Sequence, residues 1–337
     1  MECQTDFSLK ALNTFNIEAA AARYVRFDEE QEIAEYLDRC FPSEQRCLIV
    51  GGGSNLLFVA DFDGSILHPM LKGIHVVETD RRFICVKAMA GENWDDLVAH
   101  AVANGWGGIE NLSLIPGSVG ASAVQNIGAY GVAVEAVIDR VEAICMQNGQ
   151  PVTFGPQACG FDYRFSHFKG SWAGRYLITA VVFRLRRQPQ FVLTYPGVRE
   201  AVDKLGPVGL ATIRQAIINI REAKLPDPAQ IGNAGSFFKN PVVNAADLDR
   251  LLKRFNDLPY YCQGGERFKL PAGWMIERCG WKGRRIGRAA VHDRQALVLV
   301  NLGGATGREI LELSEKVQST VFDTFGIALE REVMVIS

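Results

Sequence analysis

Short apolar runs, separated by glycine, asparagine or proline, divide the first half of the chain. We expect strands over residues 47–50, 56–59, 83–87, 141–146, 152–154 and 176–185. Two helices are expected between them, one over 28–40 that Asp28 can cap and an amphipathic one over 94–103. Asn148-Gly149 separates two of the expected strands, which is a strong signal for a hairpin.

The second half of the chain shows helical spacing more often. Apolar positions three and four apart predict a helix over 211–223, and a second helix is expected after Asn244. Thr306 and Glu309 have the form of a capping box that opens a third helix. Two further strands are expected over 296–301 and 327–336. Because strands, hairpins and isolated helices follow one another without regular alternation, we predict the α+β class.

One glycine-rich stretch, residues 105–131, stands out against this pattern. It also carries Ile109, Leu112 and Ile115, so it can be held in a core, unlike a polar linker. Backbone amides presented by such a stretch suit phosphate oxygens. We therefore expect a long ordered loop around a phosphate-bearing cofactor. A glycine-rich turn region without a ligand is the alternative.

A second glycine cluster, residues 51–55, follows the first apolar strand of 47–50. Its sequence, Gly-Gly-Gly-Ser-Asn, lacks the G-x-G-x-x-G spacing, and the next residues return to a strand instead of opening a helix. The dinucleotide fingerprint of a Rossmann fold is therefore excluded. A turn that offers backbone donors to a diphosphate and a plain tight turn both remain open.

Length and composition bound the class of protein. The chain has 337 residues, 48% hydrophobic and 22% charged, which predicts a soluble globular protein of two or three domains. Thirty-six basic and thirty-eight acidic residues give a formal charge of −2, and no long basic run occurs. Nucleic acid and anionic membranes are therefore not expected as partners.

The eight cysteines form no C-x-x-C pair, and the five histidines form no cluster, so we expect no transition metal. Most of the cysteines lie in apolar surroundings, as reduced core cysteines do, which favours a cytoplasmic location. The first residues lack a hydrophobic signal core, and no apolar run approaches ~18 residues. Neither secretion nor membrane insertion is indicated.

Three polar side chains stand where a reaction centre is a reasonable hypothesis. Ser236 lies between a glycine and two phenylalanines, without the final glycine of G-x-S-x-G, so proton donation is favoured over nucleophilic attack. Glu332 lies on the last expected strand beside apolar side chains, where a carboxylate partly removed from water suits acid or base work. Arg164, in an aromatic segment, is a fixed cation for a carboxylate or a flavin-type ring.

Each of these residues also has a structural interpretation. Ser236 can be a small residue in a turn, Glu332 the solvent-facing end of a strand, and Arg164 a surface cation stacked on aromatic neighbours. Further cations can bind an anionic substrate or be simply solvated. These are Lys224, Lys239, Lys269 and the run 283–288.

Taken together, these stretches resemble the UDP-N-acetylenolpyruvylglucosamine reductase family, the flavoenzymes of bacterial cell-wall precursor synthesis. The matching motifs cover essentially the whole chain in the family's order, and a tyrosine loop after the strand 176–185 resembles its longer, type I form. The motifs are NTFNI at 13–17, GGGSNLLF at 51–58, IPGSVGASAVQNIGAYG at 115–131, FDYRFSHFK at 161–169, KLPDP at 224–228, GNAGSFFKNP at 232–241, KLPAGW at 269–274, AAVHDRQALVLVN at 289–301 and LEREV at 329–333.

The resemblance implies a two-lobed, α+β FAD-binding domain of the vanillyl-alcohol-oxidase type and an α+β substrate-binding domain. The lobes are expected over 1–68 and 69–224, with 327–337 returning to the second lobe, and the substrate domain over 225–326. FAD is expected to lie against Gly51, Gly52, Gly53, Ser54, Asn55, Pro116, Gly117, Gly120, Ala121, Gln125, Asn126, Gly128, Ala129, Tyr130 and Gly131.

The resemblance also implies the reaction and the role of each polar residue. FAD carries hydride from NADPH to the enolpyruvyl group of UDP-N-acetylglucosamine enolpyruvate, and NADPH and this UDP-sugar use one site in turn. Ser236 aligns with the proton donor, and Arg164 and Glu332 with the pair that polarises the substrate carboxylate and stabilises the enolate. Residues that hold the nucleotide-sugar are Tyr195, Arg221, Lys224, Asn240, Tyr261, Lys269 and Gln295.

The chain departs from the family pattern at Phe165 and Met334, so no second arginine is assigned near the carboxylate. We expect a monomer in the cytoplasm without bound metal. An FAD oxidase on the same fold is one alternative, because it needs the same flavin loop but not the motifs at 232–241 and 329–333. A catalytically silent flavin or nucleotide-sugar binder is another, against which the intact set of Ser236, Arg164 and Glu332 argues.

Overall fold

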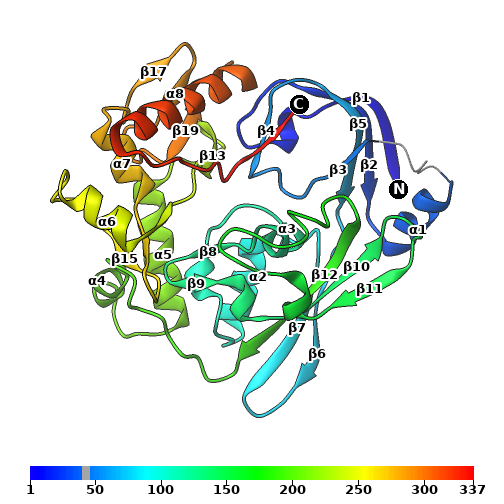
Figure 1. The fold of residues 1–337 in the computed structure, drawn as a ribbon. Helices are drawn as coiled ribbons and strands as arrows, with labels where there is room; N and C mark the ends of the chain where they lie inside the picture. Colours follow the sequence, from blue (N-terminus) through cyan, green and yellow to red (C-terminus); the bar gives the residue numbers. More distant parts are fainter. Residues whose placement is uncertain (40–45) are drawn as a thin grey trace. The chain divides into compact units, whose positions relative to one another are not determined.

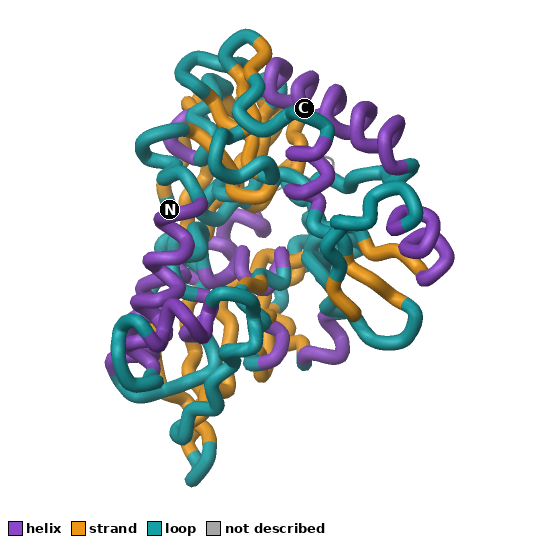
Figure 2. Tube along the Cα trace, turned by 90° about the vertical axis from the view of Figure 1, so that its left-hand side faces the viewer, coloured by secondary structure: helices purple, strands orange, loops and turns teal. Residues whose placement is uncertain are grey.

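The chain folds into two compact units, and each of them combines segments that are distant in sequence. The computed structural model describes residues 1–39 and 46–337. The first unit comprises Met1–Phe7, Ala21–Gly53 and Asp63–Ala223, and the second Ser8–Ala20, Ser54–Phe62 and Lys224–Ser337. Helices and strands succeed each other without a regular βαβ alternation, as predicted for the α+β class (Figures 1 and 2).

The N-terminal part of the first unit is a four-stranded sheet in the order β1-β2-β5-β3. Helix α1 (Glu30–Arg39) buries Ile33 and Tyr36 in a core with the apolar side of this sheet. The strands are β1 (Glu2–Ser8), β2 (Ala20–Phe27), β3 (Cys47–Ile49) and β5 (Phe62–Pro69).

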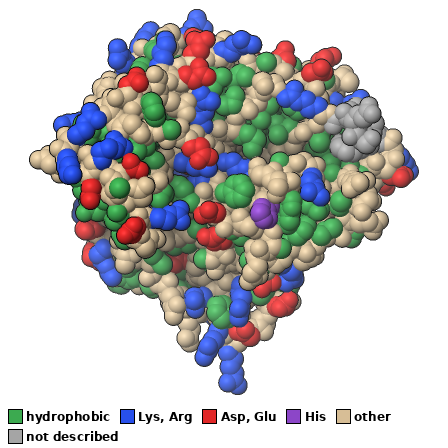
Figure 3. Space-filling model, viewed as in Figure 1, with side chains coloured by type: hydrophobic (Ala, Val, Ile, Leu, Met, Phe, Trp, Pro, Cys, Tyr) green, Lys and Arg blue, Asp and Glu red, His purple; other side chains and the backbone are tan. Residues whose placement is uncertain are grey.

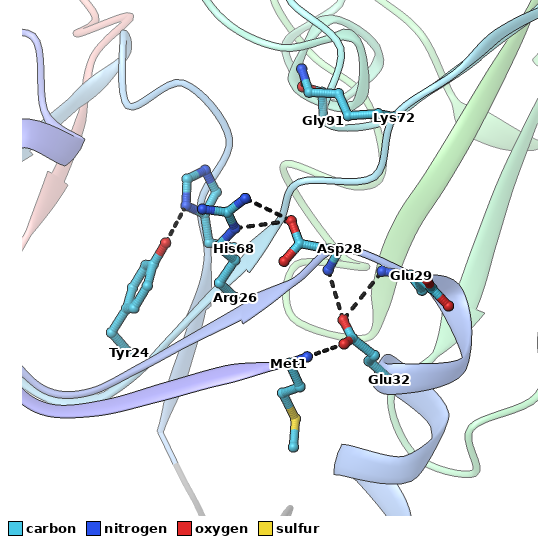
Figure 4. Close-up of polar contacts among 9 residues, drawn as sticks. All are labelled: Met1, Tyr24, Arg26, Asp28, Glu29, Glu32, His68, Lys72 and Gly91. Carbon is cyan, nitrogen blue, oxygen red and sulfur yellow. Dashed lines mark hydrogen bonds and ion pairs between the residues drawn. The ribbon is translucent and has the colours of Figure 1, made fainter.

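The start of α1 differs from the prediction. The helix begins at Glu30, and the Asp28 carboxylate accepts hydrogen bonds from Arg26 instead of capping it. The side chain of Glu32 accepts from the backbone N–H groups of Asp28 and Glu29, at 2.7 and 3.2 Å (Figure 4). A glutamate in the first turn, instead of Asp28, thus provides the side-chain acceptor at the start of the helix. Position 40, the last of the predicted helix, lies outside the described residues.

The larger sheet of the first unit has five antiparallel strands in the order β11-β10-β12-β7-β6. Its central strand β12 is buried along most of its length, and α2 and α3 share its core through Trp94, Val98, Val119 and Ala123. The predicted hairpin is confirmed as β10–β11. The elements are β6 (Ile74–Thr79), β7 (Phe83–Met89), α2 (Trp94–Ala103), α3 (Val119–Gln125), β10 (Ile138–Cys145), β11 (Pro151–Phe154) and β12 (Tyr176–Arg186).

Smaller elements complete the first unit. Helices α4 and α5 enclose a small apolar cluster of their own, joined by Tyr130, Phe191 and Leu193. The bounds are β8 (Gly128–Ala129), β9 (Val132–Ala133), α4 (Val198–Asp203) and α5 (Leu210–Lys224), with 3-10 turns at Glu110–Leu112, Val134–Ala136 and Pro156–Cys159.

The second unit is built on a four-stranded sheet in the order β13-β19-β18-β17, with the long helix α8 in its core. The capping box predicted at Thr306 and Glu309 is present at the start of α8. The elements are β13 (Gly232–Ser236), β17 (Arg285–Ile286), β18 (Ala289–Val291), β19 (Val298–Asn301), α7 (Ala272–Arg278) and α8 (Gly307–Phe325), with a 3-10 turn at Lys10–Leu12.

A three-stranded sheet, in the order β14-β16-β15, lies beside helix α6 in the second unit. Asn244 caps α6, as the sequence predicts, by accepting from the backbone N–H of Asp247. The elements are β14 (Val242–Asn244), α6 (Ala245–Leu252), β15 (Tyr261–Cys262) and β16 (Arg267–Lys269).

The C-terminal strand is shorter than predicted. Only β20 (Met334–Ile336) is regular, and it pairs in parallel with β4 (Leu56–Phe58) within the second unit, not with the lobe expected over 69–224. Residues 327–333 are not a continuous strand. They form only isolated backbone hydrogen bonds with the residues after β13. No described helix is long and apolar enough to cross a membrane.

Candidate functional site

The two glycine clusters predicted separately meet in the first unit. A Cβ atom at Gly51 would lie 2.4 Å from Ser118 Oγ, and one at Gly52 would lie 2.7 Å from Gly117 Cα. Real side chains do not approach a backbone so closely, so only glycine fits at position 52. The turn after β3 and the turn before α3 therefore form one backbone-lined surface, which is the construction that suits a phosphate group.

The 105–131 segment is more structured than the predicted loop. It contains the helix α3, whose Ser118 cap accepts from Ala121 N–H, and Asn126 ends α3 at a φ of 46°. The N–H groups of Val119 and Gly120 already donate to carbonyls of the β7–α2 connection, at 2.9 and 3.0 Å. A diphosphate would thus rely on the backbone before α3, at Gly117 and Ser118, together with residues 51–53.

Three of the other residues predicted to line the cofactor, Gln125, Asn126 and Gly128, have contacts with other segments of the first unit. Gln125 Oε1 accepts from Lys169 Nζ at 2.8 Å, and Asn126 Nδ2 donates to the carbonyl of Asp162 at 2.8 Å. A Cβ atom at Gly128 would lie 3.0 Å from an Arg164 nitrogen. These contacts bring the aromatic segment around Arg164 directly onto the 105–131 segment.

Arg164 is placed by its backbone as well as its side chain. Its φ is 55°, an uncommon value for a residue other than glycine, and a bridge between Asp162 and Phe165 closes the turn around it. Its guanidinium donates to the carbonyl of Gly128. A cation fixed in this way, beside the predicted cofactor segment, suits an anionic group of a ligand better than a solvated surface arginine would.

Ser236 stands directly after a β-bulge in the second unit. Strand β13 pairs with β19 at Asn233 and again at Ser236, with an irregularity between, and Gly235 has a φ of 67°. Bulges of this kind re-aim a side chain. Asn233, 2% exposed, fixes the bulge because its Oδ1 accepts from the N–H of Gly235 at 2.9 Å and its Nδ2 donates to the carbonyl of Ile231 at 2.9 Å.

Glu332 lies beside the segment that carries Ser236. Its N–H donates to the carbonyl of Phe237 at 2.8 Å, and the N–H of Lys239 donates to the carbonyl of Glu330 at 2.8 Å. The side chain of Asn55 donates to the carbonyl of Glu332 at 3.1 Å. The last residue of the 51–55 cluster, predicted to bind cofactor, therefore uses its amide nitrogen to hold the predicted catalytic carboxylate segment.

Most residues expected to bind the nucleotide-sugar belong to the second unit. Tyr261 and Lys269 are direct cross-strand partners, so they share one face of the three-stranded sheet. Asn240 Oδ1 accepts from the N–H of Ala272 at 2.9 Å, and Gln295 Oε1 accepts from the N–H of Leu297 at 3.4 Å. Lys224 is exposed at the end of α5.

Tyr195 and Arg221 belong to the first unit, where both meet Tyr130. The rings of Tyr130 and Tyr195 are 5.3 Å apart in an edge-on arrangement, and Arg221 interacts electrostatically with the Tyr130 side chain. Burial lowers the pKa of Arg221 and raises the pKa of Tyr130. The first unit thus brings together Arg164, Tyr195 and Arg221 around the 105–131 segment, and the second holds the other predicted catalytic and substrate-binding residues.

Several positioning residues were missed by the sequence analysis. Asn111 and Asn233 are buried asparagines whose amides bridge backbone groups, and Asn55 was assigned to cofactor alone. An asparagine two residues before a glycine, as at Asn233, is a local signal that could have identified one of them. The other predicted anion-binding cations have structural contacts, since Lys239 pairs with Glu330 at 2.6 Å and Arg284 stacks on Trp281.

Within the described residues, no group of three or more histidine, cysteine, aspartate or glutamate side chains could hold a metal ion. Acidic and basic side chains are interspersed on the face that Figure 3 displays. The candidate residues form backbone turns with a few polar side chains, which suit an organic cofactor and an anionic substrate.

Comparison with known proteins gives a consistent result. Residues 227–336 match the family model described as UDP-N-acetylenolpyruvoylglucosamine reductase, C-terminal domain, and residues 21–155 match the model described as FAD binding domain. A UDP-N-acetylenolpyruvoylglucosamine reductase of Flavobacterium johnsoniae is 42% identical over 339 residues, with all of both chains covered. One of Chromobacterium violaceum is 45% identical and covers all of this chain and 99% of its own.

Among solved structures, the UDP-N-acetylenolpyruvylglucosamine reductase of Thermus caldophilus is similar in fold. The match covers all of this chain and 98% of the other, at 23% identity and a TM-score of 0.69. This likeness extends through both units.

Proposed function

The chain belongs to the UDP-N-acetylenolpyruvoylglucosamine reductase family, and on that premise we propose that it reduces UDP-N-acetylglucosamine enolpyruvate with NADPH to give UDP-N-acetylmuramate. The oxidoreductase class, the α+β class and the cofactors FAD and NADPH, all expected from the sequence, are confirmed at the level of the family. The family's place in peptidoglycan precursor synthesis follows with it.

The turns of the first unit fit the phosphates of FAD. Gly52 and Gly117 approach so closely that their backbones leave no room for side chains, and a diphosphate needs such exposed backbone. We assign the diphosphate to residues 51–53 with Gly117 and Ser118. When bound, FAD supplies the hydride that reduces the enolpyruvyl double bond, after NADPH has reduced the flavin.

Ser236 is the proposed proton donor to the α-carbon of the substrate. It follows the irregularity in β13 at Gly235, and Asn233 fixes that bulge. Residues 237–239, directly after Ser236, pair through the main chain with 330–332, so Ser236 and Glu332 lie on neighbouring segments, and this observation supports the proposal most. A positioned acid of this kind typically contributes about 10²–10⁴-fold to a rate.

Arg164 and Glu332 are the proposed pair that stabilises the developing enolate. Arg164 supplies a fixed positive charge, held by its turn and by Gly128, for the substrate carboxylate. Glu332 is partly buried and is held through its backbone by Phe237 and Asn55. Arg164 belongs to the first unit and Glu332 to the second.

The nucleotide-sugar and NADPH are proposed to use one site in turn, in a monomeric, cytoplasmic enzyme. Lys269 and Tyr261 offer a cation and an aromatic ring on one sheet face, which suits a phosphate and a uracil ring. The proposed contacts are Tyr195, Arg221, Lys224, Asn240, Tyr261, Lys269 and Gln295.

An anaerobic absorbance experiment tests the proposal. The purified yellow protein should lose its colour when NADPH is added and regain it only when UDP-N-acetylglucosamine enolpyruvate follows. Return of colour with oxygen but not with the UDP-sugar would favour an oxidase. A protein without flavin absorbance would contradict the assignment of residues 51–53 and 117–118.

A further inference from the structure

A partly buried ion pair joins two helices of the first unit. Arg214 of α5 donates to both oxygens of Asp95 in α2, at 2.6 and 2.8 Å, and the side chains are only 18% and 22% exposed. Burial acts to raise the pKa of Asp95, but hydrogen bonds from Arg214 and from the backbone outweigh it, so the pKa lies below its usual value. Two parallel charge-assisted bonds make this a geometrically specific contact.

The Asp95 carboxylate also binds the backbone of the 105–131 segment. Asp95 accepts from the N–H of Leu114, a residue with a φ of 59°, shortly before Gly117. A leucine at positive φ is unfavourable on its own and persists only where its surroundings fix it. Asp95 therefore fixes both the backbone that leads to α3 and the side chain of Arg214 on α5.

Helix α5 connects Arg214 to Arg221, a residue proposed to bind the nucleotide-sugar. Arg221 follows Arg214 by seven residues, which is close to two helical turns, so both side chains leave the same face of α5. Arg221 interacts electrostatically with Tyr130, and Asn111 donates to the carbonyls of Tyr130 and Val192, each at 2.9 Å. The Asn111–Val192 hydrogen bond and the Arg221–Tyr130 interaction thus connect residues 188–223, here called the α4–α5 segment, to the 105–131 segment, and Arg214 reaches it through Asp95.

We propose that Asp95 and Arg214 are positioning residues that set the placement of Arg221 and Tyr195 for the nucleotide-sugar. The inference rests on the proposed function, which assigns Arg221 and Tyr195 to that substrate. Neither Asp95 nor Arg214 touches the reacting groups in this account. They act through α5, by holding it against the 105–131 segment.

Loss of the ion pair should leave the α4–α5 segment folded. The segment has its own buried apolar cluster, which does not include Arg214 or Asp95. Its buried members are Val198, Val202, Ile213, Ala216 and Ile217. In Arg214→Gln, Asp95 can still accept from the N–H of Leu114, so the backbone proposed to bind the cofactor keeps its conformation. Helix α5, however, loses its fixed position against the 105–131 segment.

The test compares Arg214→Gln with Arg199→Gln in the holoenzyme. Arg199 lies on α4 in the same segment, but its ion pair with Asp203 is 3.8 Å long and more than half exposed. We expect Arg214→Gln to raise KM for UDP-N-acetylglucosamine enolpyruvate by about tenfold, the cost of one charge-assisted contact. The kcat value, flavin absorbance and flavin retention should stay within about twofold, and Arg199→Gln should resemble wild type.

Two further variants sharpen the result. Asp95→Asn should raise KM to a similar extent, and the double variant should add little, because both changes remove one interaction. Arg214→Lys should restore part of the affinity through its charge. An unchanged KM in Arg214→Gln, or equal losses of kcat and flavin in it, would overturn the positioning role.

Hydrogen exchange separates this inference from the proposed function. If wild type does not turn over the enolpyruvyl sugar, the proposed function fails, but the contact can still be tested. Arg214→Gln should speed amide exchange in peptides covering 188–197 and 210–224, whereas Arg199→Gln should not. Equal exchange in the two variants would contradict the coupling of α5 to the 105–131 segment.

Discussion

The two units hold their proposed reacting groups by different means. In the first unit, the Arg164 side chain itself reaches a carbonyl of the 105–131 segment. In the second, Ser236 and Glu332 are placed by main-chain hydrogen bonds between the segments that carry them. A side-chain anchor is removed by one substitution, whereas main-chain pairing is lost only when the backbone shifts. The two units should therefore differ in which substitutions they tolerate.

The largest effect is expected at Gly52, where the backbone of Gly117 leaves no space for a side chain. Gly52→Ala places a Cβ atom 2.7 Å from Gly117 Cα, a backbone atom that cannot move aside. We expect loss of bound FAD, measured as the ratio of absorbance at the flavin band to that of the protein. Gly209→Ala is the matched control, since its nearest neighbour would be 4.0 Å away. Full flavin occupancy in Gly52→Ala would contradict the proposed cradle.

The next effect separates two glutamates of the second unit. Glu332→Gln should lower kcat by about 10²-fold or more with FAD retained, since one electrostatic contact to the enolate is weakened. Glu330→Gln, two residues away, should have little effect, because Glu330 is 72% exposed and pairs with Lys239 at the surface. Steady-state kinetics would decide this, and equal losses in both variants would remove Glu332 from the mechanism.

A smaller effect should come from the asparagine that fixes the bulge. Asn233→Ala leaves the N–H of Gly235 without its acceptor, which should lower the free energy of unfolding by about 1–3 kcal/mol. It should also slow turnover, because Ser236 loses its fixed position. Asn256→Ala, at an exposed position of the same unit, serves as control. Urea denaturation measures the first effect, and unchanged turnover would show that Ser236 does not depend on the bulge.

An effect of pH on stability distinguishes the two units. His68 of the first unit is 8% exposed and hydrogen-bonded to the Tyr24 hydroxyl, and burial lowers its pKa to about 4 (Figure 4). The unfolded chain takes up this proton near pH 6.5, whereas the folded chain does so only near pH 4. Stability should therefore fall by up to about 3 kcal/mol as the pH drops through that window.

His68→Asn removes this dependence while keeping an acceptor for Tyr24. The difference in urea midpoint between wild type and His68→Asn should change between pH 7 and pH 5, with wild type losing more stability. The second unit's His292 should matter less, because burial lowers its pKa but neighbouring Asp293 opposes that shift. The same pH response in both proteins would contradict the assignment to His68.

Regular elements with a clear period were predicted well from the sequence. Helix α2 has the predicted bounds, and α6 and α8 begin at the predicted caps. The β10–β11 hairpin was found because Asn148-Gly149 is a local signal. In each case the information lies within a few neighbouring residues, so no knowledge of the tertiary structure was needed.

Elements that depend on distant partners were predicted less well. The terminal strand was predicted too long because residues 329–332 alternate like a strand. Their backbone hydrogen bonds with residues 237–239 form no continuous ladder, and the Gln318 side chain of α8 donates to the carbonyl of Leu329. Helix α3 was predicted as part of a loop because its glycine and other small residues show no apolar spacing typical of a helix. Asn111 and Asn233 were missed because a single buried asparagine leaves no periodic trace.

The family and the roles of the polar residues came from motif resemblance, whereas the polar residues themselves were already candidates by their setting in the sequence. The structure adds which of them share a unit. The meeting of Gly52 with Gly117, and of Arg164 with Gly128, joins stretches more than 30 residues apart in sequence. No spacing rule predicts such contacts. The roles of the individual site residues remain proposals that the variants above test.

The most direct test of the proposed reaction follows each half of the cycle in Ser236→Ala by stopped-flow absorbance. Bleaching by NADPH should keep its wild-type rate, while recovery of flavin colour with UDP-N-acetylglucosamine enolpyruvate should slow by about 10²–10⁴-fold. Ser319→Ala, at an exposed position of α8, should match wild type in both halves. Wild-type recovery of colour in Ser236→Ala would show that this serine is not the proton donor.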